Sequence, residues 1–267
     1  MKLGFITSIL DGWTYEQMMD FASGQGFECV EVACWPEEKA ERRYAGVSHI
    51  DAERVNQDDE YAAHIMAYAE KAGVEISALA YYPNVMTADK EKRNAAIEHL
   101  KNVIRASKKL GVGMVTTFIG RDQTKNVREN LELVKEIWPP IIKLAEICDV
   151  KIAIENCPML FGEEQWPGGQ NLMTTPSIWR EVFKILDSDN LGINYDPSHF
   201  IWQMIDYIRP LYEFKDKIFH VHYKDIKIYR DKLESVASWL IRWNICHLRF
   251  RDLAMWTGEN TCQHLLI

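Results

Sequence analysis

The stretch KIAIENC (151–157) is a short apolar run that ends in the polar pair Glu155 and Asn156. A helical pattern precedes it (127–148), and another one starts after Thr175 with Pro at its first position (176–186). Near-continuous apolar runs of this length are typical of strands covered on both faces, as in a parallel sheet. The stretch therefore predicts one repeating unit of an α/β protein.

The same alternation of apolar runs and helical patterns extends along the chain in both directions. Six further strands are expected at 3–8, 29–35, 75–82, 113–120, 191–197 and 218–225. Three further helices are expected at 15–23, 58–72 and 89–110. The first strand is not followed by a Gly-rich phosphate loop, which disfavours a dinucleotide-binding fold. Seven strands joined by helices predict a (β/α)8 TIM barrel, incomplete because no eighth β-rich run with a helix before it follows Asp225.

Composition and the sequence pattern disfavour several classes of partner. A formal net charge of -8 disfavours nucleic acids and anionic membranes, which attract basic surfaces. The sequence has no apolar run of about 20 residues that could span a bilayer, and its N-terminus reads as a strand instead of a signal peptide. Six scattered cysteines without a CxxC pair indicate free thiols in a reducing compartment. We therefore expect a cytoplasmic protein with no membrane or nucleic-acid partner.

Metal-ligand residue types follow the last three expected strands. Glu155 lies at the end of the fifth strand, Asp196 lies at the end of the sixth with His199 three residues later, and His222 and Lys224 lie in the seventh. In a barrel these strand ends share one mouth, where active sites of this fold lie. Two carboxylates and an imidazole from adjacent strands suit a divalent cation, although each residue alone is equally compatible with a structural role.

Three segments also carry a family resemblance: AIENCP, NYDPSH and HVHYKD, in this order and spacing. They resemble the sugar phosphate isomerase/epimerase family of xylose isomerase-like TIM barrels. That group includes ketose 3-epimerases, inosose dehydratases and apurinic-site DNA endonucleases. The resemblance runs from Met1 to about Val236, and it implies a barrel domain at 1–236 that contains strands one to seven.

The resemblance implies roles for the residues at the strand ends. Glu155, Asp196 and His222 would bind a divalent metal ion (Mn, Mg, Co or Zn, with Mn favoured). The implied reaction moves a proton next to a carbonyl through an enediolate, whose charge the metal neutralises. Glu155 would be the catalytic base, and His199 would act catalytically near the substrate oxygens or orient a ligand.

Three residues are candidates for substrate binding. Lys224 could stabilise an oxyanion or a phosphate, or it could pair with Asp225 in the barrel wall. Trp35 and Tyr82 could stack on a sugar, although aromatic residues at strand ends are also typical of the core. The third and fourth expected strands end without the histidines that the endonuclease branch uses, which disfavours nuclease activity.

We therefore expect a metal-dependent sugar or keto-sugar isomerase or epimerase with a small-molecule sugar substrate, phosphorylated or not. A keto-sugar lyase or inosose-type dehydratase would use the same scaffold and base. A non-catalytic sugar-binding subunit is a third alternative. The sequence leaves open whether the chain forms a homo-oligomer.

The tail at 237–267 does not resemble the family, whose members continue with a Gly-rich segment and an eighth strand that carries a fourth ligand, a glutamate. The tail contains three Trp and no Lys. One explanation is a divergent extension, and the other is a single-base frameshift near Val236. Met255-Trp256-Thr257 must be encoded as ATG TGG ACN. In a displaced frame the same bases contain GTG GAC, which encodes Val-Asp, a pair found in the Gly-rich segment of the family. We expect the fourth ligand, and with it two-sided proton transfer, to be lost.

Overall fold

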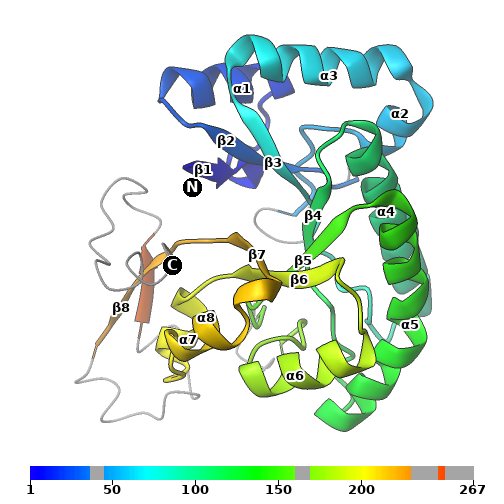
Figure 1. Ribbon diagram of the computed structural model, residues 1–267, viewed down its shortest axis with the longest axis vertical. Coiled ribbons are helices and arrows are strands. Elements are labelled where there is room, and N and C mark those ends of the chain that lie inside the picture. The colour runs from blue at the N-terminus through cyan, green and yellow to red at the C-terminus, as the bar shows by residue number, and fades with distance from the viewer. Residues whose placement is uncertain (37–44, 160–168, 230–245, 250–267) are drawn as a thin grey trace.

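The structure, a computed structural model, describes residues 1–36, 45–159, 169–229 and 246–249 of the 267-residue chain. Seven parallel strands are paired in chain order and form a half-barrel with helices on its outer side (Figure 1). They are β1 (Gly4–Ile6), β2 (Cys29–Ala33), β3 (Glu75–Ala80), β4 (Met114–Thr117), β5 (Lys151–Glu155), β6 (Leu191–Tyr195) and β7 (Ile218–Val221). All seven expected strands are present, each shorter than the apolar run that predicted it.

The helices lie between the strands in sequence. They are α1 (Tyr15–Gly24), α2 (Ala52–Gln57), α3 (Asp59–Ala72), α4 (Lys90–Lys109), α5 (Val127–Cys148), α6 (Pro176–Ile185), α7 (Ser198–Trp202) and α8 (Arg209–Glu213). The five expected helices form, and α6 begins at Pro176 with Thr175 as its cap. The short helices α2, α7 and α8 were not expected, because five or six residues carry too little periodicity. Among these helices, none is long and apolar enough to cross a membrane.

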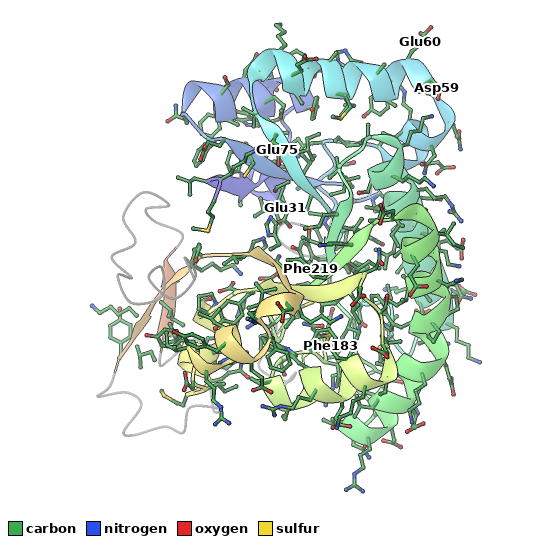
Figure 2. The ribbon with its side chains drawn as sticks, in the orientation of Figure 1. Glu31, Asp59, Glu60, Glu75, Phe183 and Phe219 are labelled. Atoms are coloured by element: carbon green, nitrogen blue, oxygen red, sulfur yellow. The ribbon has the colours of Figure 1, made fainter. Side chains whose placement is uncertain are left out.

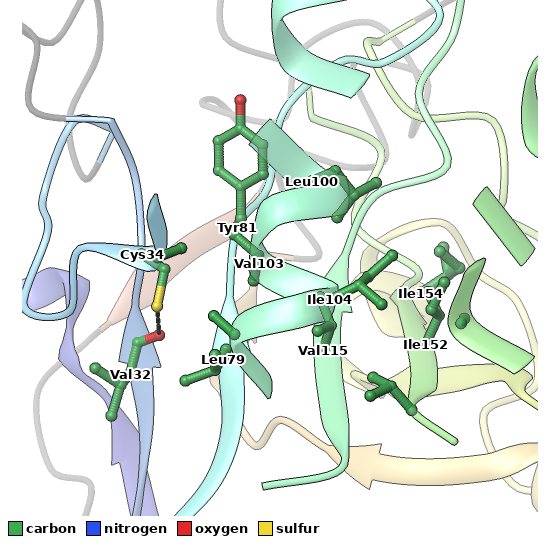
Figure 3. Close-up of a cluster of buried hydrophobic side chains, with 14 of the residues drawn as sticks. Val32, Cys34, Leu79, Tyr81, Leu100, Val103, Ile104, Val115, Ile152 and Ile154 are labelled. Carbon is green, nitrogen blue, oxygen red and sulfur yellow. Dashed lines mark hydrogen bonds between the residues drawn. The ribbon is translucent and has the colours of Figure 1, made fainter. Parts of the chain in front are cut away.

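The main core lies between the sheet and the helices around it. Val32, Leu79 and Val115 project from successive strands into one cluster, and Leu100 and Ile104 of α4 pack in the same cluster beside β3 and β4 (Figure 3). Each of these five side chains is fully buried, which stabilises the fold by about 1.5–3 kcal/mol per side chain. This packing fixes the strands, and thereby the positions of the residues at their carboxyl ends.

The two outer strands, β1 and β7, leave the half-barrel open. Within the described residues β1 pairs only with β2 and β7 only with β6, so that each of the two has one edge without a partner strand. Every residue of β7 is only half-buried, whereas β2 and β6 are buried throughout. The incomplete barrel expected from the sequence is therefore confirmed, with two strand edges open to a further segment.

The end of the described chain forms a separate pair of strands. β8 (Asp225–Ile228) pairs antiparallel with β9 (Cys246–Arg249), beside the half-barrel (Figure 1). The expected strand 218–225 is therefore divided, because β7 ends at Val221 and β8 starts a new direction at Asp225. β9 is the one part of the 237–267 tail that the structure describes, and the displaced-frame segment lies outside the described residues.

Candidate metal and active site

Four polar side chains meet at the carboxyl ends of β5, β6 and β7. The ammonium of Lys224 lies 2.8 Å from Glu155 Oε1, 2.5 Å from Asp196 Oδ2 and 3.3 Å from His199 Nε2. His199 Nε2 is also 3.3 Å from Asp196 Oδ2 and 3.6 Å from Glu155 Oε1. Glu155, Asp196 and His199 are all buried. Four of the residues singled out from the sequence are therefore in direct contact.

Asn156 joins the two strands that carry the carboxylates. Its side-chain amide donates to the Asp196 carbonyl at 2.8 Å, and the Asp196 N–H donates to the Asn156 carbonyl oxygen at 2.7 Å. Ser198 then donates to Asp196 Oδ1 through its N–H at 3.0 Å and its hydroxyl at 2.6 Å. These bonds hold one carboxylate oxygen of Asp196 and leave Oδ2 directed at Lys224.

His222 lies between two carboxylates. The backbone N–H of His222 donates to the Tyr195 carbonyl at 2.9 Å, which continues the β6–β7 pairing one residue past β7. Its Nδ1 is 3.4 Å from Glu155 Oε1, and its Nε2 is 2.5 Å from Glu31 Oε2. The ring therefore borders Glu155 as expected, but its shortest contact is with Glu31, which the sequence did not single out.

Glu31 forms the centre of a hydrogen-bonded network inside the half-barrel. Its Oε1 accepts from the Tyr82 hydroxyl at 2.6 Å and from the Thr116 hydroxyl at 2.7 Å. Asn194 donates to the Tyr82 oxygen at 3.1 Å, and its own oxygen lies 3.1 Å from His220 Nδ1. The network joins β2, β4, β6 and the ends of β3 and β7, so that it fixes the wall of the site.

The two aromatic candidates for substrate binding occupy different positions. The ring of Tyr82 is buried and packs on Phe118 with ring centroids 4.7 Å apart. Trp35 is half-buried and meets Tyr81 edge-on at 5.0 Å. Trp35 also packs against the small cluster that contains Tyr82 and Phe118. Tyr82 is therefore held by the network, and Trp35 is the more exposed of the two.

The charges of Glu31 and His222 stabilise each other. Burial alone would raise the pKa of Glu31, but the neighbouring His222 imidazolium lowers it to about 2. Burial would likewise lower the pKa of His222, but the carboxylates of Glu31 and Glu155 raise it to about 10. Both residues are therefore charged at neutral pH, with the His222 ring protonated on both nitrogens.

Lys224 keeps the carboxylates of Glu155 and Asp196 ionised, as His222 does for Glu31. Burial opposes ionisation of Glu155 and Asp196, but the Lys224 ammonium outweighs it and lowers both pKa values. Burial would lower the pKa of His199, but its neighbours Cys157 and Asp196 raise it. Lys224 and His222 thus favour the charged forms of Glu31, Glu155 and Asp196 in this buried site.

The residues present fit a divalent metal ion. Ligand atoms of Glu155, Asp196 and His199 all lie within 4.8 Å of one another, and those of Glu31, His220 and His222 form a second such group. In the first group the Lys224 ammonium already lies where both carboxylates would bind a cation. Carboxylate oxygens and imidazole nitrogens are ligands of Mn²⁺, Zn²⁺ and Mg²⁺ in proteins.

Sequence comparison identifies one family over most of the chain. The family model described as "Xylose isomerase-like TIM barrel" matches residues 19–247. The protein YfiH of Bacillus subtilis is 24% identical, with 86% of this chain and 74% of that protein aligned.

Solved structures share the fold. The probable 3-DHS dehydratase AsbF of Bacillus anthracis, involved in petrobactin synthesis, is 18% identical with a TM-score of 0.64, over 88% of this chain and 76% of that chain. The 3-keto-D-glucoside 4-epimerase YcjR of E. coli is 15% identical with a TM-score of 0.63, over 84% of this chain and 79% of that chain. At these identities the likeness is one of fold, and it includes both an epimerase and a dehydratase.

Proposed function

Because the chain belongs to the xylose isomerase-like TIM barrel family, we propose that it is a divalent-metal-dependent isomerase or epimerase of a sugar or keto-sugar. The observation that carries the proposal is the contact of Glu155, Asp196 and His199 with the Lys224 ammonium at the carboxyl ends of the strands. Two buried carboxylates around a cation are suited to a substrate whose oxygens become negative during reaction.

The metal would be held by Glu155, Asp196 and His222, with Mn²⁺ favoured over Mg²⁺, Co²⁺ and Zn²⁺. When bound, it would neutralise the charge that develops on the carbonyl and neighbouring hydroxyl oxygens of the substrate. His222 would take part through its imidazole ring, whose Nδ1 lies 3.4 Å from Glu155 Oε1. Asn156 and Ser198 support this role of Asp196, because they hold its backbone and its other oxygen.

In the proposed reaction one side chain removes the proton, and others stabilise the negative charge that results. Glu155 removes the proton from the carbon next to the carbonyl, since its lowered pKa keeps it ionised. Lys224 and His199 face the same carboxylate and stabilise the enediolate oxygens by hydrogen bonds. Trp35 and Tyr82 line the sugar-binding side, with Tyr82 fixed through its hydroxyl.

A keto-sugar lyase or dehydratase is the second candidate, and the position of Lys224 favours it. Its ammonium lies 2.8 Å from Glu155 Oε1, so that a base and an acid stand on the same side of the site. After Glu155 removes the proton, Lys224 can protonate a leaving hydroxyl, which departs as water. Elimination of this kind needs no second base on the opposite face of the sugar.

We further propose a cytoplasmic protein that acts on a small sugar and does not bind nucleic acid. The net charge of -8 supports this, as does the lack of histidine at the ends of the third and fourth strands in the sequence.

Turnover of a panel of ketoses and 3-keto-glycosides in D2O with added Mn²⁺ tests the proposal. An isomerase or epimerase incorporates deuterium next to the carbonyl and forms a new sugar, whereas a dehydratase forms an unsaturated product; NMR separates the two. Glu155→Gln should abolish deuterium incorporation. Purified wild-type protein that binds a sugar but no divalent ion, with sugar binding unchanged in Glu155→Gln, would instead favour a non-catalytic sugar-binding subunit.

A further inference from the structure

Glu31 is a charged residue in the middle of a buried strand. It is the third residue of β2, CVEVA, and the other four residues of that strand are apolar and buried. Its side chain is 2% exposed and extends from β2 toward the inside of the half-barrel (Figure 2). A carboxylate in this position is costly unless it forms several hydrogen bonds.

Both oxygens of Glu31 are occupied by protein donors. Oε1 accepts from Tyr82 and Thr116, and Oε2 lies 2.5 Å from His222 Nε2. His220 is farther away, with Nδ1 at 3.7 Å from Glu31 Oε2. That nitrogen is instead 3.1 Å from the Asn194 oxygen. Glu31 therefore takes its hydrogen bonds from Tyr82, Thr116 and His222, whereas Glu155 and Asp196 share the Lys224 ammonium.

The contact with Glu31 decides which nitrogen of His222 faces the metal site. A carboxylate accepts a hydrogen bond but cannot donate one, so Nε2 must carry a proton when it contacts Glu31. Nδ1 is the nitrogen on the Glu155 side, at 3.4 Å. An imidazole that binds a metal through one nitrogen commonly donates from the other to a carboxylate, which fixes its tautomer and orientation.

We propose that Glu31 is a positioning residue that keeps a proton on Nε2 of His222 and makes Nδ1 the metal-binding atom. The inference rests on the proposed function, because it requires a divalent ion bound by Glu155, Asp196 and His222. Glu31 then does not bind the metal ion itself, and His220 does not affect the affinity for metal.

Titration of the full-length chain with Mn²⁺ and with Zn²⁺ in a calorimeter tests the inference. Glu31→Gln keeps the size of the side chain but replaces the charged acceptor with a neutral one. We expect it to bind each ion about 10-fold to 100-fold more weakly, as is typical for loss of such a partner. Circular dichroism checks that the variant is folded.

His220→Gln tests the alternative that Glu31, His220 and His222 bind a metal ion together. The matched control is His64→Gln, which changes a half-exposed imidazole on α3 that pairs with Glu16 away from the site. We expect both variants to keep the wild-type affinity and stoichiometry for both ions. Wild-type affinity in Glu31→Gln would overturn the inference. An equal loss in His220→Gln would also overturn it, because Glu31 and His220 would then bind a metal themselves.

A second measurement does not depend on the variant being folded. Nitrogen-15 NMR of the imidazole side chains in the metal-loaded wild type should show the His222 proton on Nε2 and the metal on Nδ1. The opposite assignment would overturn the inference while leaving the proposed function intact. A wild-type chain that binds neither ion would contradict both.

Discussion

Lys224 Nζ lies 2.8 Å from Glu155 Oε1 and joins the segment after β7 to the end of β5. The same ammonium is 2.5 Å from Asp196 Oδ2, so one cation bridges two buried carboxylates from neighbouring strands. A divalent ion bound by these carboxylates would compete with the ammonium for the same oxygens. Lys224 therefore links the stability of the metal-free chain to its affinity for metal.

Lys224→Met should destabilise the metal-free protein and increase its response to metal. The change leaves Glu155 and Asp196 without the ammonium, and breaking a buried ion pair costs about 3–5 kcal/mol. We expect the lower end of that range, because a quarter of the Lys224 side chain is exposed. Added Mn²⁺ should then raise the thermal midpoint of the variant by more than that of the wild type.

Lys135→Met is the control for this experiment. Lys135 pairs with Glu132 on the surface of α5, where an ion pair contributes about 0–1 kcal/mol. A thermal midpoint for Lys224→Met equal to that of the control would show that the bridge does not stabilise the fold.

The stability of the metal-free chain should decrease as pH rises above neutrality. The folded-state pKa of His222, about 10, lies above its unfolded value of about 6.5, so its contribution is complete below about pH 6.5 and is lost as pH rises toward 10. The folded-state pKa of Glu31 is lowered to about 2, so its contribution is complete above about pH 4.5 and is lost toward pH 2. Urea unfolding between pH 6 and 9 measures the loss of the His222 contribution.

His222→Gln should flatten this pH dependence between pH 6 and 9, since glutamine does not titrate. In the wild type, metal must replace a proton on His222, and its affinity should therefore rise with pH across the same interval. Calorimetric titration in buffers of different ionisation enthalpy reports the proton released. Metal binding without proton release would show that His222 is not protonated in the metal-free chain.

Much of the fold could be predicted because each strand is bounded by residues that a sequence reveals. Gly73 is an example: it ends α3 with φ of 67°, a conformation that favours glycine, just before β3. Glu155 and Asp196 were identifiable because Glu155 ends an apolar strand and Asp196 directly follows one, where a barrel directs side chains into its mouth. Both contact Lys224, for which the sequence had offered Asp225 as the partner in the barrel wall.

Glu31 could not be identified in the same way, because it lies inside a strand and not at its end. Its one signal is a charged residue in a strand that is otherwise apolar, which is equally typical of an edge or a solvent-facing position. Its partners Thr116 and His222 are 85 and 191 residues away in sequence. Such contacts depend on the curvature of the sheet, which no local pattern encodes.

Restoring the displaced frame from about Val236 should complete the barrel. We propose that residues 237–267 replace an eighth strand and helix, which would pair with the open edges of β1 and β7. The restored chain should show a higher free energy of unfolding and a larger urea m-value, because more surface becomes buried. The coding DNA is the direct check: a gene whose natural relatives share the present tail in frame would refute the frameshift.

Asn156→Ala should weaken both the fold and the metal site. The change removes the acceptor for the buried Asp196 N–H and the donor to the Asp196 carbonyl, and an unsatisfied buried group costs about 1–3 kcal/mol. Because Asp196 also loses its backbone anchor, we expect a lower Mn²⁺ affinity in addition to a lower free energy of unfolding. Urea unfolding and calorimetric titration measure the two effects.

The matched control is Asn190→Ala, at the opposite end of the same two strands. Asn190 donates to the Val150 carbonyl at 3.0 Å and so joins the starts of β5 and β6 instead of their ends. We expect this variant to lose stability while its Mn²⁺ affinity stays within about twofold of wild type, because binding free energy is sensitive to ligand position and not to distant backbone contacts. Equal losses of affinity in both variants would mean that Asn156 acts on the site through general stability alone.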